Sequence, residues 1–335
     1  MSRAVISLGS SPTPRLAKLA WGTLAYNLAV IAWGAFVRAT GSGAGCGRHW
    51  PMCNGEVIPR PKHVETVIEL AHRLSSGVAL ILVVATCVAT FRAWPRGSSA
   101  RRAAATSVGF IFGEALLGAG LVLFELVAHD ASMKRALSMA LHLNNTFFLL
   151  AAITATAYFV SGGDKIRWRD QGLVRAPLGS ALLAMMLLGT SGALAALGDT
   201  LFPATSLAAG IGQDLSAGAH VLVKLRGLHP LIAVGTGLVV TSAGAAARRA
   251  RPGDAAIATT SRALAGAFVA QLCLGVANLL LLAPVAIQLA HLVLADVVWI
   301  LLVLVTLRVL AARATSEAAV DLSPTSSDRG TVPLR

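Results

Sequence analysis

The sequence predicts an all-α integral membrane protein with eight transmembrane helices. Of its 335 residues, 56% are hydrophobic and only 13% are charged, and the mean hydropathy is +0.72. Soluble domains carry roughly 25% charged residues, so this composition argues against a soluble domain and against a disordered chain. The chain also holds a series of apolar runs of about 20 residues, the length at which a helix crosses a hydrocarbon core about 30 Å thick.

Eight such runs fill the chain and leave no soluble domain. We place them at 18–38, 67–91, 105–127, 135–160, 177–197, 218–243, 261–282 and 285–311. The first run is not followed by a small-residue cleavage site and is longer than the apolar part of a signal peptide. We therefore interpret it as a retained helix.

The distribution of basic residues predicts the orientation. The net charge is +13, which could suggest nucleic acid as a partner, but Lys and Arg lie in short clusters between the apolar runs. These clusters fall in the N-terminal tail and in the loops after even-numbered runs, whereas the link around Pro284 has none. This is the pattern of the positive-inside rule, so we expect both termini in the cytoplasm, membrane lipid around the chain, and no nucleic-acid partner.

The two halves of the chain resemble each other. Glu69-Leu-Ala-His72 opens the second run, and Arg226-Gly-Leu-His229 lies at the same place in the sixth. Similarly, His142 lies early in the fourth run and His291 early in the eighth. The nearly constant offset along the chain indicates a duplicated four-helix unit.

This duplication predicts two pseudo-symmetric four-helix bundles, at 18–160 and 177–311, joined by a cytoplasmic linker at 161–176. A cytoplasmic tail at 1–17 precedes them. The segment 312–335, rich in Ser, Thr and charged residues, is expected to form a disordered cytoplasmic tail.

Four histidines inside the apolar runs are the strongest functional signal: His72, His142, His229 and His291. A polar side chain is costly there and becomes a functional hypothesis by default. In the predicted topology all four share one membrane depth, two in each half. Bis-imidazole haem ligation in each bundle needs this arrangement. A proton relay or a bound transition metal stays an alternative, although zinc-type metals usually need three or four ligands close together.

The remaining polar residues near this depth have two interpretations. His49, His63, His129 and His220 fall in or beside external loops and are interpreted as solvated. Six basic residues lie near the outer boundary, where haem propionates would need cationic partners, although such side chains also commonly extend to lipid headgroups. They are Arg38, Arg73, Lys134, Arg135, Lys224 and Arg226.

A glycine-rich external loop joins the first two runs and contains Cys46 and Cys53. Because the loop faces an oxidising compartment in this topology, we expect a disulfide, either a structural clasp or a redox-active pair. Glu69 precedes His72 by three residues and so projects from the same helix face. Beside an iron-bound His72, this acid could move protons or stabilise a cationic intermediate; otherwise it is an ordinary interfacial acid.

The halves differ chemically at this position, because the second repeat has Arg226 where the first has Glu69. The difference favours a reaction site in the first half and an electron-transfer or structural haem in the second. Glu114 and Gln271 also occupy matching places, where interhelical hydrogen bonds are the preferred interpretation over proton supply. Pro230 is expected to kink the helix beside His229.

Taken together, these residues resemble the heme A synthase family. The similarity spans all eight runs, and no single motif would suffice. It is carried by Val37-Arg38-x-Thr-Gly-Ser-Gly-x-Gly-Cys46, Trp50-Pro51-x-Cys53-Asn54-Gly55, Glu69-x-x-His72-Arg73, Leu-His142-Leu-x-Asn145 and Gln288-Leu-x-His291-Leu-x-Leu-Ala-Asp296.

The resemblance implies a two-bundle fold that oxidises the C8 methyl of heme O to the formyl group of heme A by successive hydroxylations. It implies that His72 and His142 flank the substrate haem, that His229 and His291 ligate a haem b cofactor, and that Glu69 is the catalytic acid. Cys46 and Cys53 match the family's external cysteine pair. The resemblance further implies partnership with heme O synthase and supply to haem-copper oxidase assembly. We expect a location in the bacterial cytoplasmic membrane, and the oligomeric state stays open, with a homo-oligomer as one alternative.

Two residues depart from the family pattern: His49 stands where an acid is expected before Trp-Pro, and Pro230 follows His229 where the first repeat has Arg73. The main alternative function is a di-haem cytochrome b-like carrier that exchanges electrons with quinone, in which Glu69 would be dispensable. A transporter with duplicated halves is a third hypothesis, although transporter sites usually use unwound helices near the midplane.

Overall fold

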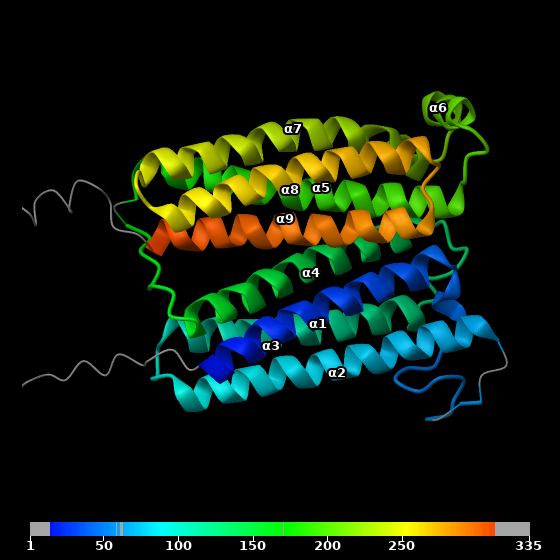
Figure 1. Cartoon of the computed structure of the whole chain (residues 1–335). Helices are drawn as coiled ribbons and strands as arrows, with labels where there is room; N and C mark the ends of the chain where they lie inside the picture. The colour runs from blue at the N-terminus through cyan, green and yellow to red at the C-terminus, as the bar shows by residue number, and fades with distance from the viewer. Residues whose placement is uncertain (1–13, 58, 61–62, 170, 312–335) are drawn as a thin grey trace, which may run out of the picture.

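The computed structural model describes residues 14–57, 59–60, 63–169 and 171–311, and this part of the chain is helical, without a β-strand. Eight of its helices are long and apolar enough to cross a membrane, and they run roughly parallel or antiparallel to one another (Figure 1). The predicted all-α membrane fold with eight spans is therefore confirmed.

Each predicted apolar run coincides with one long helix. These helices are α1 (Pro14–Ala39), α2 (Val64–Ala93), α3 (Ser99–Leu123), α4 (Met133–Val160), α5 (Arg175–Leu201), α7 (Val221–Ala250), α8 (Ala255–Leu280) and α9 (Val285–Ala311). α7 continues through Pro230 without a break.

Capping residues, rather than hydropathy, determine where several helices begin. The Ser98 hydroxyl accepts a hydrogen bond from the backbone N of Arg101 at 3.3 Å, and Asp254 accepts one from Ile257 at 2.9 Å. Such caps satisfy backbone donors that the helix itself leaves unpaired. α3 and α8 consequently begin six residues before the apolar runs that predict them, at 105 and 261.

The short helix α6 (Leu207–Leu215), between α5 and α7, is absent from the sequence prediction. Its nine residues are too few to span a membrane, so a search for long apolar runs passes over it. Ser206 caps its start, accepting from the backbone N of Ala209 at 3.1 Å. α6 stands beyond the ends of the long helices, at the same end of the molecule as the loop between α1 and α2 (Figure 1).

Contacts among the long helices fall into two sets, which we call the N-terminal half (α1–α4) and the C-terminal half (α5–α9). In the first set, α1 and α3 each contact α2 and α4; in the second, α5 and α8 each contact α7 and α9. α4 also packs on α5 and α9, and α1 packs on α9. Because helices pack closely across the boundary, the division into two separate bundles stays a prediction.

The structure describes only part of the predicted tails and most of the predicted linker. Of the predicted tail at 1–17, only the last four residues are described, and they already belong to α1, which starts at Pro14, because proline suits the first turn of a helix. The predicted tail at 312–335 lies outside the described residues. In the predicted linker, the backbone N of Arg167 donates to Leu310 O at 2.9 Å and so ties the linker to the end of α9.

Aromatic stacking holds the boundary between the halves. The rings of Phe147 on α4 and Trp299 on α9 stack with centroids 4.8 Å apart, and Trp299 Nε1 donates to Phe147 O at 2.8 Å. Gly189 on α5 lies directly against the same phenyl ring, where a Cβ would come within 2.4 Å of Phe147 Cε2. Three helices from both halves therefore meet in one close-packed contact.

Arg38 joins the halves near the opposite end of α1 from Pro14. Its Nη1 donates to Ala196 O and to Thr200 Oγ1 on α5, each at 2.7 Å, and its Nη2 donates to Gln288 Oε1 on α9 at 2.9 Å. One guanidinium thus links α1 to two helices of the other half. In the sequence this residue was a candidate for contacting a propionate; in the structure it also has this packing role.

We expect Arg38→Ala to lower the free energy of unfolding by roughly 2–4 kcal/mol, because it removes three charge-assisted hydrogen bonds and leaves their acceptors unpaired. Thermal unfolding in detergent measures the change. Arg48→Ala is the control, since the Arg48 side chain is 68% exposed and its ion pair with Glu125 spans 3.5 Å. Such pairs contribute little, so equal destabilisation by the two variants would contradict the role given to Arg38.

Candidate functional site

The structure brings the four intramembrane histidines together as two pairs. The imidazole of His72 on α2 lies close enough to that of His142 on α4 to interact electrostatically, and His229 on α7 is placed similarly relative to His291 on α9. Among the described residues, no three or more His, Cys, Asp or Glu side chains are grouped so that they could hold a metal ion. Each half of the protein therefore contributes two imidazole side chains, the number that bis-imidazole haem ligation uses.

A glycine on a neighbouring helix faces each of these histidines, a feature that the sequence analysis missed. The glycines lie on α1, α3, α5 and α8, and they recur between the halves at nearly the same offset as the histidines, which supports the predicted duplication. The pairs are Gly34 with His72, Gly118 with His142, Gly192 with His229 and Gly275 with His291; an added Cβ would lie 2.9, 3.8, 3.1 and 3.1 Å, respectively, from the nearest imidazole atom.

Two histidines have a partner on Nδ1. Glu114 Oε2 lies 2.8 Å from His142 Nδ1, and Ser191 Oγ lies 2.9 Å from His229 Nδ1. A partner on one ring nitrogen fixes the tautomer and the ring orientation and leaves the other nitrogen for a ligand. The Glu114–His142 contact is an ion pair by distance and is not among the hydrogen bonds of the described residues. His72 and His291 differ, because their buried Nδ1 atoms have neither an ion pair nor a hydrogen bond in the described part of the chain.

Glu114 and Gln271 occupy matching positions and have matching contacts. Glu114 Oε1 accepts from Asn145 Nδ2 at 2.6 Å and from Thr146 Oγ1 at 3.1 Å, so the expected interhelical hydrogen bonds are present. Gln271 Nε2 lies 3.2 Å from His291 Nε2 and donates to His291 O at 3.0 Å. Each side chain thus also orients a histidine. A ligand bound through Nε2 of His291 would replace the Gln271 contact.

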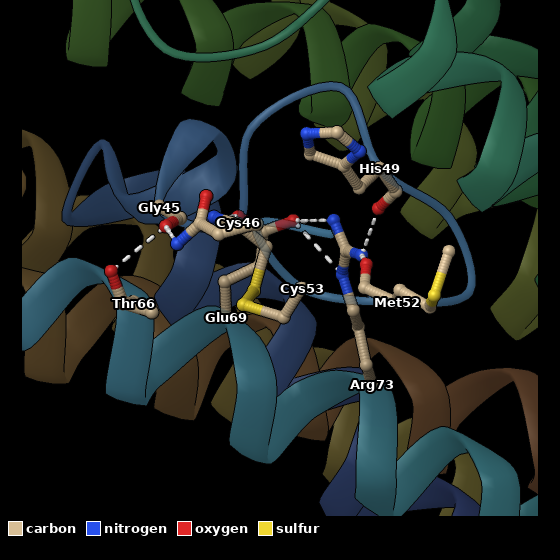
Figure 2. The surroundings of a disulfide bond; sticks show 9 residues. Gly45, Cys46, His49, Met52, Cys53, Thr66, Glu69 and Arg73 are labelled. Atoms are coloured by element: carbon tan, nitrogen blue, oxygen red, sulfur yellow. Dashed lines mark hydrogen bonds and ion pairs between the residues drawn. A yellow bond between two sulfur atoms is a disulfide. The ribbon is translucent and has the colours of Figure 1, made fainter. Parts of the chain in front are cut away.

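Glu69 is buried, with 3% of its surface exposed, and lies between Arg73 on its own helix and Cys46 in the loop between α1 and α2 (Figure 2). Its Oε2 accepts from the backbone N of Cys46 at 2.7 Å. Its Oε1 accepts from Arg73 Nε at 3.1 Å and from Arg73 Nη2 at 2.5 Å. Arg73 also donates to the carbonyl oxygens of His49 and Met52 in the loop. Such burial and three donors distinguish Glu69 from an ordinary interfacial acid.

The loop between α1 and α2 is closed by the predicted disulfide between Cys46 and Cys53, which is confirmed. Both cysteines are buried. Thr66 Oγ1 donates to Gly45 O at 2.8 Å, and a Cβ on Gly45 would lie only 2.4 Å from Glu65 O. Only glycine allows this approach, so the backbone of the loop lies directly on the first turns of α2.

Three of the four other cationic candidates also have protein partners. Arg226 contacts Asp199 at 3.3 Å and Asp214 at 2.6 Å, two carboxylates that sequence reasoning did not connect with it. Arg135 donates to Ala128 O at 2.6 Å and Asp130 O at 2.8 Å, and Lys224 donates to Ala217 O at 3.0 Å. Lys134 has no hydrogen bond or ion pair among the described residues. Propionate binding by this set stays a prediction.

Comparison with known proteins decides the family. A family model described as cytochrome oxidase assembly protein, COX15-CtaA, matches residues 17–303. The chain belongs to this family. Heme A synthases from Bacillus mycoides and Bacillus cereus are 43% identical to it over 97 residues, which cover 29% of this chain and 31% of theirs. The resemblance to heme A synthases inferred from the motifs is thereby confirmed.

Longer relatives in the same comparison carry a different name. Proteins named protoheme IX farnesyltransferase, from two strains of Thermus thermophilus, are 49% identical over 289 residues. The match covers 86% of this chain but 47% of theirs. This chain therefore spans about half the length of these relatives, and their name describes proteins with a large part that it does not match.

The contact between Gly34 and His72 predicts that two glycine-to-alanine substitutions on α1 change the free energy of unfolding in opposite directions. Gly34→Ala should lower the free energy of unfolding by roughly 1–3 kcal/mol, because the new methyl group meets the imidazole. Gly22→Ala should raise it by about 0.5–1 kcal/mol, since nothing lies within 4 Å of a Cβ there and alanine favours the helix. Thermal unfolding in detergent measures both changes. If the unfolding midpoints of the two variants shift in the same direction, the result argues against the contact.

Proposed function

We propose that the chain is a heme A synthase, which oxidises the C8 methyl of heme O to the formyl group of heme A. Membership of the family and similarity to Bacillus proteins of that name support the proposal. The observation that carries it is Glu69, a buried carboxylate one helical turn from His72. The equivalent position beside His229 is Arg226, so the N-terminal half alone combines the histidine pair with this acid.

In this proposal heme O binds in the N-terminal half, between His72 and His142. Glu114 holds His142 through Nδ1, which leaves Nε2 of that ring directed away from the carboxylate and available to the substrate iron. Glu69 is held by the Cys46 N–H and by Arg73, so its position is fixed before substrate arrives. From there the carboxylate can accept a proton from the substrate or stabilise positive charge that develops on it.

We propose that His229 and His291 in the C-terminal half hold haem b. The residues fit this group: the half supplies two imidazoles, Ser191 engages Nδ1 of His229, and Gly192 and Gly275 let their helices approach the two rings closely. When bound, haem b supplies one-electron redox chemistry. Gln271 orients His291 through its backbone oxygen, and its amide contact with Nε2 is the one that an iron ligand would displace.

We propose a bacterial cytoplasmic membrane location with both termini in the cytoplasm and the disulfide loop outside. The arginines between α2 and α3 and at the end of α7 support this orientation. We also propose that a heme O synthase supplies the substrate and that the product serves haem-copper oxidase assembly. The Thermus relatives support the first partner, because they are named for farnesyl transfer to protoheme IX and have length for a second unit.

Co-expression with a heme O synthase, in a host that makes no heme A, tests the reaction. Haems extracted from the membranes are identified by chromatography and mass. We expect heme A with the wild type and at least about 100-fold less with Glu69→Ala, the usual scale for loss of an acid–base group. Glu65→Ala is the matched control, since Glu65 is exposed one turn earlier on α2 and should leave heme A production unchanged.

The same experiment separates the two leading functions. Normal heme A production by Glu69→Ala would remove the catalytic role of this acid. Haem b and unaltered heme O from a normally assembled wild type, without heme A, would instead favour the di-haem electron carrier.

Haem content tests the assignment of the second histidine pair. We expect His229→Ala and His291→Ala each to reduce the haem b bound per mole of purified protein by at least about tenfold, because each removes an axial ligand. His63→Ala, at the exposed start of α2, should retain the wild-type content. Pyridine haemochrome spectra of purified protein measure the content, and full retention of haem b by both ligand variants would contradict the assignment.

A further inference from the structure

A pocket of about 310 Å³ lies where α2 ends and α3 begins. Its size falls at the lower end of the roughly 300–1,000 Å³ range of small-molecule sites. It is lined by Phe91, Arg96, Gly97, Arg101, Arg102 and Ala105. The α2–α3 connection is at the opposite end of the molecule from the disulfide loop and α6 (Figure 1), so this pocket is separate from the proposed catalytic site.

Three arginines give the pocket a concentrated positive charge, and no acidic side chain is among its lining residues. The Arg96 side chain has no hydrogen bond or ion pair among the described residues, and the Arg102 side chain makes only one there, a long hydrogen bond of 3.4 Å to Ser99 Oγ. Arg101 donates to Phe91 O, but its Nε is buried and unpartnered in the described part of the chain. Guanidinium donors therefore remain available for an anion.

The start of α3 adds to this preference for negative charge. Backbone N–H groups and the positive end of the helix dipole face outward at a helix N-terminus, where acidic residues or anions are favourable. The first turn of α3 contains no acidic residue, and Arg101 and Arg102 place like charge there instead. A bound phosphate would neutralise this charge and bond the guanidinium groups.

The apolar side of the pocket indicates where such a phosphate comes from. Phe91 lies in the last turn of the spanning helix α2, is 42% exposed, and carries the Arg101 guanidinium 5.0 Å from its ring centroid. Ala105 lies one turn beyond Arg101 on α3. The charged groups thus sit where two spanning helices leave the membrane, beside apolar surface that an acyl chain can cover.

We propose that this pocket binds the phosphate headgroup of an anionic phospholipid. The proposal is independent of the proposed function and of the orientation in the membrane, because both leaflets present headgroups. It distinguishes these arginines from Arg248 and Arg249 at the end of α7, which carry similar charge but do not line the pocket.

Native mass spectrometry of the detergent-solubilised protein tests the proposal, with phosphatidylglycerol and phosphatidylcholine of identical acyl chains as probes. We expect phosphatidylglycerol to bind more tightly, and the double variant R96Q/R102Q to weaken its binding about tenfold, because two guanidinium–phosphate contacts are lost. R248Q/R249Q removes the same charge elsewhere and should change binding less than twofold. Neither Arg96 nor Arg102 forms an ion pair in the described chain, so thermal unfolding of the pocket variant should match the wild type.

Three results would overturn the proposal. The first is equal affinity of the wild type for the two lipids, and the second is equal weakening by the two double variants. The third is displacement of phosphatidylglycerol by an excess of glycerol 3-phosphate, which has the phosphate without acyl chains and would assign the pocket to a soluble phosphate ester.

Discussion

A polar side chain inside an apolar layer must be matched by a partner on a neighbouring helix or serve a ligand, and this constraint governs the packing around the four histidines. Glu114 and Ser191 match two of the imidazoles through Nδ1, and Gln271 contacts a third. Bringing these partners into reach requires the helices to approach closely, which the glycines facing the rings permit. The close approach of α1, α3, α5 and α8 to the histidine-bearing helices is therefore linked to the polar residues that those helices carry.

The two halves use an arginine in the same way but with different acids. Arg73 ties the disulfide loop to α2 through Glu69 on its own helix, whereas Arg226 ties α7 to Asp199 on α5 and Asp214 on α6. Both therefore hold a connecting segment against the end of a long helix. Only in the N-terminal half is the paired acid one turn from a histidine, and this difference is the reason for the proposal that places a carboxylate-assisted reaction in that half.

The sequence predicts the spans, the disulfide and the histidine pairs, because length, hydropathy and residue type are properties of single segments. It does not predict α6, which is too short for a hydropathy search, or the Glu69 contact with Cys46, because a backbone N–H carries no residue signature. Nor does it predict that Asp214 meets Arg226, since a separation of 12 residues across a turn matches no helical period.

Arg38 links the surroundings of the two histidine pairs. On α1 it follows Gly34, which faces His72, by one turn. Its hydrogen bonds reach Ala196, one turn beyond the glycine that faces His229, and Gln288, one turn before His291. The same guanidinium therefore contacts the surroundings of both pairs. Sliding of one half against the other would break these hydrogen bonds and leave the Ala196, Thr200 and Gln288 oxygens without the guanidinium, so Arg38 opposes a change in the separation of the two pairs.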